Sequence, residues 1–315
     1  MIMVTVIVLL AFALLLLILW TYCKVNKGIC KFSGHMVGKV VIVTGANAGI
    51  GFETAKDLAQ RGAFVIAACR NEEKGKNAVY QIIESSRNNN VLFIQLDLAS
   101  FASIKKFVEE VMRKVSRVDV LINNAGVYAT TNEKTEDGFL VGMQVNYLGP
   151  FLLTSLLLPI LKSSAPSRII NVSSIVYRFG KTNYYNFDSM RRIRNFTVYS
   201  TAKLFIMLMT IELNRQLRGS GVTVNCLHPG VVNTNMIDNI NIRVFRIILK
   251  ILKSFYKNSW EGAQTTIYLS VSPDVKDISG HYFQDCHIAN LTSKAQNLIE
   301  AKKLWDISEK LVKLK

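Results

Sequence analysis

Tyr199 and Lys203 are four residues apart in the stretch NFTVYSTAKLFIMLMTIEL, residues 195–213. On a helix this spacing places both side chains on one face, one turn apart. The segment is strongly apolar from Leu204 on, and a lysine facing a packed core is costly unless it has a partner or a task. The other interpretation is a solvent-exposed helix start with Lys203 snorkelling. Spacing alone favours that second interpretation, because Tyr-x-x-x-Lys occurs by chance in many helices.

The chemistry that such a pair supports is proton transfer. A free tyrosine has a pKa of about 10 and is a poor base at neutral pH. A nearby ammonium favours the phenolate, and one helical turn is a distance over which Lys203 can lower the pKa of Tyr199. Reversible reduction of a carbonyl needs such a group, which donates a proton and can take it back.

A glycine-rich turn, TGANAGIG, lies between the first expected strand and the first expected helix. A phosphate-binding turn needs glycine where the chain bends, where the backbone approaches a pyrophosphate, and where helix and strand pack closely. The spacing here is G-x-x-x-G-x-G, with Gly45, Gly49 and Gly51. A plain tight loop is the alternative, but a position after the first strand of an α/β series favours a dinucleotide site.

Arg70 stands where the second expected strand ends, in the sequence ACRN. An NAD-specific site would present Asp or Glu to the ribose hydroxyls there. A guanidinium instead suits a 2′-phosphate, so we expect NADP(H) as the cofactor. The alternative is an exposed arginine at a strand end, and Ala48, before the second glycine, brings no second positive charge.

Strand-like and helix-like patterns alternate along the chain, which predicts an α/β fold with a doubly wound parallel sheet and right-handed crossovers. The β-branched run KVVIVTG is typical of a parallel strand covered on both faces. Strands are expected at 39–45, 63–69, 91–98, 118–126, 168–174, 222–230 and 280–283, and helices at 50–62, 71–86, 101–115, 138–162 and 199–217.

The first twenty residues, MIMVTVIVLLAFALLLLILW, carry no charged side chain and are long enough to cross about 30 Å of hydrocarbon as a helix. A cleaved signal peptide would have positive charge before a shorter apolar core. Instead Trp20 and Tyr22 suit the membrane interface, and the cations Lys24, Lys27 and Lys31 follow them. We therefore expect an uncleaved single-pass transmembrane helix with the body of the protein in the cytosol.

Composition narrows the class of protein further. The chain has 315 residues, 50% of them hydrophobic, and a formal net charge of +16, but no interleaved aromatic and basic motif that would indicate a nucleic-acid partner. Five cysteines without a CxxC pair favour a reduced compartment. Four scattered histidines give no metal-ligand pattern, so no metal is expected.

Short motifs follow one another in a fixed order: TGANAGIG (44–51), Asp97-Leu98, NNAG (123–126), VNYLG (145–149), NVSS (171–174), YSTAK (199–203) and PGVVNT (229–234). In this combination the chain resembles the short-chain dehydrogenase/reductase family over residues 34–310, and within it the membrane-bound retinol dehydrogenases. The resemblance implies an anchor at 1–22, a basic juxtamembrane linker at 23–38 and one Rossmann-like catalytic domain at 39–315. It leaves a homodimer open and makes the endoplasmic reticulum the expected membrane.

The resemblance also implies roles for individual residues. Tyr199 would exchange the proton, Lys203 would hold the nicotinamide ribose, Ser174 would bind the substrate oxygen, and Asn146 would bind a water that passes protons to Lys203. A strand-end turn at Ser174 and a helix hydrogen bond at Asn146 are the alternatives. The implied cofactor-binding residues are Gly45, Ala46, Asn47, Ala48, Gly49, Ile50, Gly51, Arg70, Asp97, Leu98, Asn124, Ala125, Gly126, Tyr199, Lys203, Pro229, Gly230 and Thr234.

Two segments depart from the commonest family pattern. About two dozen aromatic and basic residues separate Ser174 from Tyr199, either as a loop over the cofactor cleft or as a solvated surface loop. Within 239–257, cations at three- and four-residue steps form a narrow stripe beside a wide apolar face: Arg243, Arg246, Lys250, Lys253 and Lys257. This is the pattern of a helix in a membrane interface. A helix packed on the domain with its charges in water is the alternative.

Together these observations predict a membrane-anchored, NADP(H)-dependent oxidoreductase that interconverts a lipophilic alcohol and its aldehyde or ketone. Retinol and retinal are the leading pair, and membrane lipids are expected contacts. A steroid or lipid-aldehyde reductase is an alternative of the same chemistry. A non-catalytic nucleotide-binding membrane scaffold is an alternative of another class, but it would not need Asn146, Ser174, Tyr199 and Lys203 together.

Overall fold

The computed structural model describes residues 27–129, 131, 133–182, 187, 194–232 and 256–314, together with Leu14, Ile18 and Thr21. The expected anchor (1–22), apart from those three residues, lies outside the described part of the chain. So do Thr234, residues 183–186 and 188–193 of the insert between Ser174 and Tyr199, and residues 239–255 of the second expected membrane segment.

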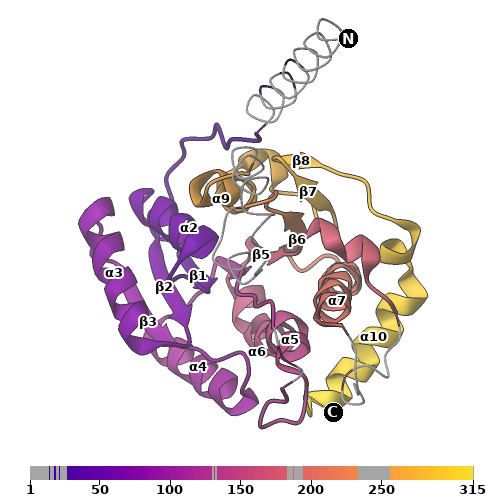
Figure 1. Ribbon diagram of the computed structural model, residues 1–315. Helices are drawn as coiled ribbons and strands as arrows, with labels where there is room; N and C mark the ends of the chain where they lie inside the picture. Colours follow the sequence, from indigo (N-terminus) through magenta and orange to yellow (C-terminus); the bar gives the residue numbers. More distant parts are fainter. Residues whose placement is uncertain are drawn as a thin grey trace, which may run out of the picture.

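An eight-stranded sheet forms the centre of the fold, in the order β3-β2-β1-β4-β5-β6-β7-β8 (Figure 1). Every neighbouring pair is parallel except β7 and β8. The bounds are β1 Val40–Thr44, β2 Phe64–Cys69, β3 Val91–Gln95, β4 Val120–Asn123, β5 Ser167–Val172, β6 Val222–His228, β7 Tyr282–Gln284 and β8 His287–Ile288. The predicted doubly wound parallel sheet is confirmed, and the order reverses direction between β1 and β4.

Helices cover both faces because side chains alternate across each strand. In β1, Val41 and Val43 pack into one core and Ile42 into the other. The first core is closed by α2 (Gly49–Gln60), α3 (Glu72–Ser86) and α9 (Ser259–Val271). The second is closed by α4 (Phe101–Lys114), α6 (Gly149–Ser163), α7 (Asn195–Gln216) and α10 (Leu298–Leu311).

The C-terminal helix α10 packs across α6 and α7. Trp305 meets Phe151 edge-on at a ring-centroid distance of 4.7 Å, and Ser308 shares a buried 2.7 Å hydrogen bond with Tyr147. With α10 in place α7 is buried on most of its surface, which explains an apolar pattern without a clear polar face. In the described part of the chain, two helical stretches are long and apolar enough to cross a membrane, Val141–Ser163 and Asn195–Gln216. Each is 78% buried in the fold over its apolar window.

Several elements differ from the expectation. The helix expected over 138–162 is interrupted: α5 (Val141–Met143) leads into a π-helical turn, Gln144–Leu148, before α6 begins. Helix α7 begins at Asn195, four residues before its expected start. Helices α9 and α10 and strand β8 were not predicted at all.

We predict that Trp305→Ala lowers the free energy of unfolding by about 3–5 kcal/mol, because it removes the large side chain that joins α10 to α6. Ile299→Ala is the matched control on the same helix, since Ile299 is 79% exposed. Urea denaturation of the purified protein measures both. Equal effects of the two substitutions would show that α10 is not part of the core.

Candidate active site

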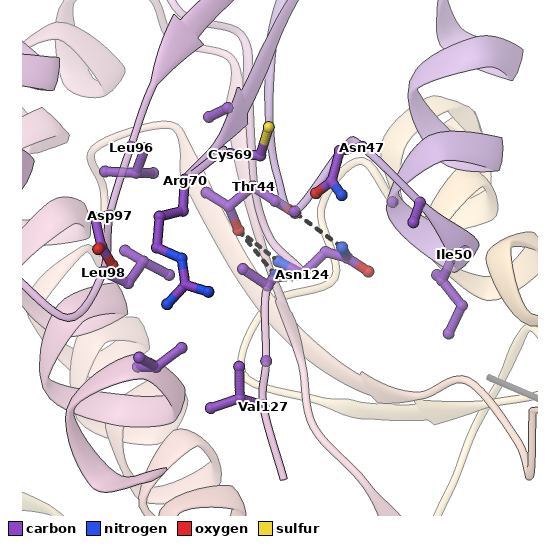
Figure 2. Close-up of a pocket in the computed structure, with 18 of the residues that line it drawn as sticks. Thr44, Asn47, Ile50, Cys69, Arg70, Leu96, Asp97, Leu98, Asn124 and Val127 are labelled. Carbon is purple, nitrogen blue, oxygen red and sulfur yellow. Dashed lines mark hydrogen bonds between the residues drawn. The ribbon is translucent and has the colours of Figure 1, made fainter. Parts of the chain in front are cut away.

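A cavity of about 480 Å³ opens at the carboxyl ends of β1, β2 and β4, where the winding of the sheet reverses (Figure 2). Such a switch point is the usual ligand site of an open α/β sheet. Of the expected cofactor residues, the lining includes Gly45, Asn47, Ala48, Gly49, Ile50, Gly51, Arg70, Asp97, Leu98, Asn124, Ala125 and Gly126. Ala46 is buried in the core under α2 and does not line it.

The turn between β1 and α2 forms a cradle that side chains would fill. Gly45 and Gly49 have φ of +69° and +59°, in the left-handed region that favours glycine. A Cβ atom on Gly51 would lie 2.3 Å from the Gly45 carbonyl oxygen. No side chain caps α2, and its first turn holds no acidic residue, so its N–H groups are available to an anion. The turn therefore fits the diphosphate of a dinucleotide.

Thr44 joins this turn to the strand across the switch point. Its hydroxyl oxygen accepts the N–H groups of Asn124 at 2.9 Å and Ala125 at 3.0 Å, and the Asn124 side chain donates to the Thr44 carbonyl at 2.8 Å (Figure 2). These bonds hold the NNAG segment beside the glycine turn. Sequence reasoning missed Thr44, although it directly precedes Gly45.

Arg70 lines the adenosine end of the cavity with Asp97 and Leu98. Its side chain is exposed and lies beside Leu98 in Figure 2. The Arg70 carbonyl accepts a 3.0 Å bond from the Gln95 side chain, which fixes the backbone here. The Asp97 carboxylate is used within its own turn, accepting the Ala99 N–H at 2.9 Å. Among the described residues that line the cavity, Arg70 is the one that carries a positive charge.

Lys203 is only 4% exposed, and its ammonium donates to the Val172 carbonyl at 3.0 Å. Burial lowers its pKa to about 8. The Nζ atom lies 5.6 Å from the centre of the Tyr199 ring. The structure therefore rejects the interpretation of a snorkelling lysine at an exposed helix start, because the side chain faces inward one turn from Tyr199.

Tyr199 lies against Ser174, whose hydroxyl hydrogen-bonds the phenol. Burial raises the pKa of Tyr199 to about 12 and outweighs the opposing effect of that bond. The pKa of Tyr199 in the chain by itself therefore lies above the ordinary value of tyrosine, and the expected net lowering is wrong, because desolvation of the phenolate dominates. At neutral pH Tyr199 is a protonated phenol, a form that can donate.

Asn146 lies in the π-helical turn and is buried. Its side chain accepts the Val127 N–H at 3.0 Å and donates to the carbonyls of Val127 and Gly142, each at 2.7 Å. The bond to Gly142 is the helix hydrogen bond considered as the alternative, and the pair to Val127 adds a tie to the NNAG segment. A Cβ atom on Gly126 would lie 2.8 Å from Asn146 Oδ1 and 3.4 Å from Lys203 Nζ, so both groups converge on Gly126.

The structure does not bring every expected residue to the cavity. Tyr199, Lys203, Pro229 and Gly230 are not among its lining residues. Tyr199 instead lines a small space beside it with Val127 and Leu140. The lining residues that sequence reasoning missed are Thr44, Ala68, Cys69, Leu96, Val127, Val141, Val145 and Ser259. Most adjoin a predicted residue, whereas Ser259 begins the unpredicted helix α9 and had no local signal.

A doubly wound sheet with a dinucleotide cradle beside a Ser–Tyr–Lys set defines a nicotinamide-dependent oxidoreductase. The chain belongs to the short-chain dehydrogenase family, whose model, described as "short chain dehydrogenase", matches residues 39–244. Enzymes of this family use NAD(P)(H).

Individual relatives show which members of this family the chain is similar to. Retinol dehydrogenase 14 of Mus musculus is 45% identical over 291 residues, 89% of this chain and 87% of that protein. Retinol dehydrogenase 11 of Homo sapiens is 42% identical over 283 residues, 90% of this chain and 88% of that protein. The enzyme is thus a short-chain dehydrogenase/reductase that is similar to retinol dehydrogenases.

Solved structures share the fold. An uncharacterised protein from Mycobacterium paratuberculosis superposes with a TM-score of 0.73 at 31% identity, covering 89% of this chain and 95% of that one. A short chain dehydrogenase from Escherichia coli CFT073, complexed with NADPH, gives a TM-score of 0.62 at 24% identity, covering 79% and 97%. At that identity the second likeness shows the fold alone.

We predict that Lys203→Met stabilises the free protein by about 2–3 kcal/mol below pH 8, after the lost bond to Val172 is counted. The lysine pKa is 10.5 in the unfolded chain and about 8 in the folded one. Between these values the unfolded state binds more protons, so wild-type stability rises with pH. The advantage of the variant should therefore shrink from pH 8 and vanish near 10.5 in urea titrations. An advantage independent of pH would contradict the burial of a charged lysine.

Proposed function

We propose that this protein is an NADP(H)-dependent oxidoreductase that interconverts a lipophilic alcohol and its carbonyl, with retinol and retinal as the leading pair. The observation that carries the chemistry is the convergence of half-buried Tyr199 and Ser174 with the buried Lys203 beside a dinucleotide cradle. Similarity to retinol dehydrogenases 11 and 14 supports the choice of substrate.

When bound, the nicotinamide supplies or accepts the hydride. The residues of the chain handle the proton and the substrate oxygen. Tyr199, protonated at neutral pH, donates its proton to the carbonyl oxygen in reduction, and the Ser174 hydroxyl holds that oxygen next to the phenol. In the oxidation direction the phenolate has to form, and the ammonium of Lys203 one turn away stabilises it.

Asn146 and Gly126 lie next to the residues that handle the proton. Asn146 fixes Val127, and Gly126 leaves space between Asn146 Oδ1 and Lys203 Nζ. That space suits a water that relays protons to the lysine. Arg70 at the adenosine end would pair with a 2′-phosphate, which favours NADP(H) over NAD(H).

We further propose that residues 1–22 anchor the protein as a single-pass membrane protein, with the catalytic domain in the cytosol and the endoplasmic reticulum as the membrane. The uncharged run of twenty residues followed by lysines supports this orientation. A lipophilic substrate fits this placement, since it partitions into the bilayer.

We predict that Tyr199→Phe lowers the rate of retinal reduction by about 100-fold or more while NADPH binding is nearly unchanged, because only the proton-carrying oxygen is lost. NADPH oxidation with retinal in detergent measures turnover, and fluorescence titration measures cofactor binding. Tyr80→Phe, at a tyrosine 66% exposed on α3, is the control. If the variant kept more than a tenth of the activity, Tyr199 would not be the proton donor. No turnover of retinal by the wild type, with turnover of steroids or other lipid carbonyls, would reassign the substrate.

We predict that Arg70→Asp shifts the cofactor preference from NADPH towards NADH, since it removes the cation and supplies an acceptor for the ribose hydroxyls. The ratio of kcat/KM for the two cofactors measures the shift. Arg113→Asp, at an exposed arginine of α4, controls for net charge. An unchanged ratio in the Arg70 variant would mean that Arg70 does not contact the 2′-phosphate.

A further inference from the structure

Four segments that are distant in sequence meet at one corner of the fold, beside the first turn of α9. We call it the α9 corner: residues 27–30, 231–232 and 257–261, and Asp285. Lys27 Nζ lies 2.5 Å from a Glu261 carboxylate oxygen. The Cys30 N–H donates to the Gln264 side chain of α9 at 3.1 Å. The residues that follow the expected anchor are therefore held against α9.

The second expected membrane segment enters the fold at the same corner. The Lys257 N–H donates to the Val231 carbonyl at 2.9 Å, and Val232 and Lys257 form a parallel bridge. The Lys257 ammonium pairs with Asp285. A Cβ atom on Gly28 would lie 2.0 Å from the Asp285 carbonyl carbon, so the residues after the anchor pack on the same residue. Asp285 therefore contacts both Gly28, which follows the segment 1–26, and Lys257, which follows the segment 233–255.

The α9 corner differs from an ordinary water-facing surface, where charged side chains are exposed and large apolar side chains are mostly covered. Its charged groups are paired and turned inward: the Lys27, Glu261 and Lys257 side chains are 6%, 16% and 10% exposed. Two of its apolar side chains face outward, Trp260 at 46% and Val231 at 50% exposed, whereas Val232 is buried. Tryptophan is the residue most typical of a membrane–water interface, because its ring is apolar and its N–H is polar.

A lipid bilayer is the one partner that fits all of these observations. The run of residues 1–20 is uncharged, and the sequence of 239–257 would give a helix with an apolar face and a cationic stripe, so the sequence of both segments has the chemistry of lipid contact. We propose that the α9 corner is the surface through which the folded part of the protein lies on the bilayer, with Trp260 and Val231 in the interfacial region. This placement rests on the anchor assigned in the proposed function.

The proposal also places the cofactor cavity relative to the bilayer. Ser259 is adjacent to Trp260 and lines the cofactor cavity opposite Gly49. Lys257 lies over Gly230, since a Cβ atom there would come within 2.8 Å of the lysine side chain. On this placement the rim of the cofactor cavity formed by α9 lies next to the bilayer, so the folded domain is held against the layer in which a lipophilic substrate dissolves.

Tryptophan fluorescence of the full chain in phosphatidylcholine vesicles, measured without added cofactor, tests the proposal. The chain has three tryptophans, Trp20, Trp260 and Trp305, and Trp305 is buried in the core. The difference in emission between Trp20→Phe and the double variant Trp20→Phe/Trp260→Phe isolates Trp260. We expect lipids brominated near the headgroup to remove more than half of that emission and aqueous iodide to remove little. Emission quenched by iodide but not by bromolipid overturns the proposal. Emission protected from both reagents also overturns it, and indicates that protein, such as a second copy, covers the corner.

Activity provides a second readout. The double substitution Trp260→Ser/Val231→Ser changes two exposed side chains, so folding is not at risk. In vesicles it should raise KM for retinal by about threefold or more while KM for a short water-soluble aldehyde is unchanged. Ile299→Ser, at an exposed residue of α10, is the matched control. Equal KM values for retinal in variant and wild type would contradict the proposal. Absence of retinal turnover by the wild type in detergent would instead reject the proposed substrate and leave the quenching result standing.

Discussion

The hydroxyl of Thr44 joins the two halves of the sheet at the point where its winding reverses. Buried at 1% exposure, it accepts two N–H groups from the segment after β4 and donates to the Ile122 carbonyl. That segment continues through Gly126, on which Asn146 and Lys203 converge, to Val127, which Asn146 holds by its main chain. Beyond the ladder between β1 and β4, this hydroxyl therefore ties the dinucleotide cradle to the segment on which Asn146 and Lys203 converge. A shift of the segment would displace both.

The buried charge of Lys203 lowers the stability of the folded core. Its ammonium is held by a carbonyl, and the described residues give it no carboxylate partner. A carboxylate would stabilise the charge and raise the lysine pKa, whereas the carbonyl leaves that pKa at about 8. The core thus accepts a destabilising charge, and the proton transfer that we propose gives a reason for keeping it. Desolvation acts on Tyr199 in the opposite chemical sense, by keeping the phenol protonated.

The C-terminal part of the chain encloses a site to which it contributes few reactive groups. Helix α10 covers α7 and α6 through Trp305 and Ser308. Helix α9 brings Ser259 to the cavity and receives the residues that follow the expected anchor. In this way the path of the chain links the cofactor cavity to the corner that we assign to the bilayer.

Sequence alone determined the order of the elements around the site and the glycine cradle, it placed Arg70 at the end of a strand, and resemblance to the family pointed to Asn146, Ser174, Tyr199 and Lys203. Each is carried by local signals: strand periodicity, glycine spacing, and polar residues at fixed positions in motifs. The same reasoning failed for α9, α10 and the contribution of Ser259, because these depend on contacts between residues distant in sequence. It also gave the wrong direction for the pKa of Tyr199. Spacing shows that a lysine lies one turn away, but desolvation depends on everything packed around the phenol, and only the tertiary structure decides that.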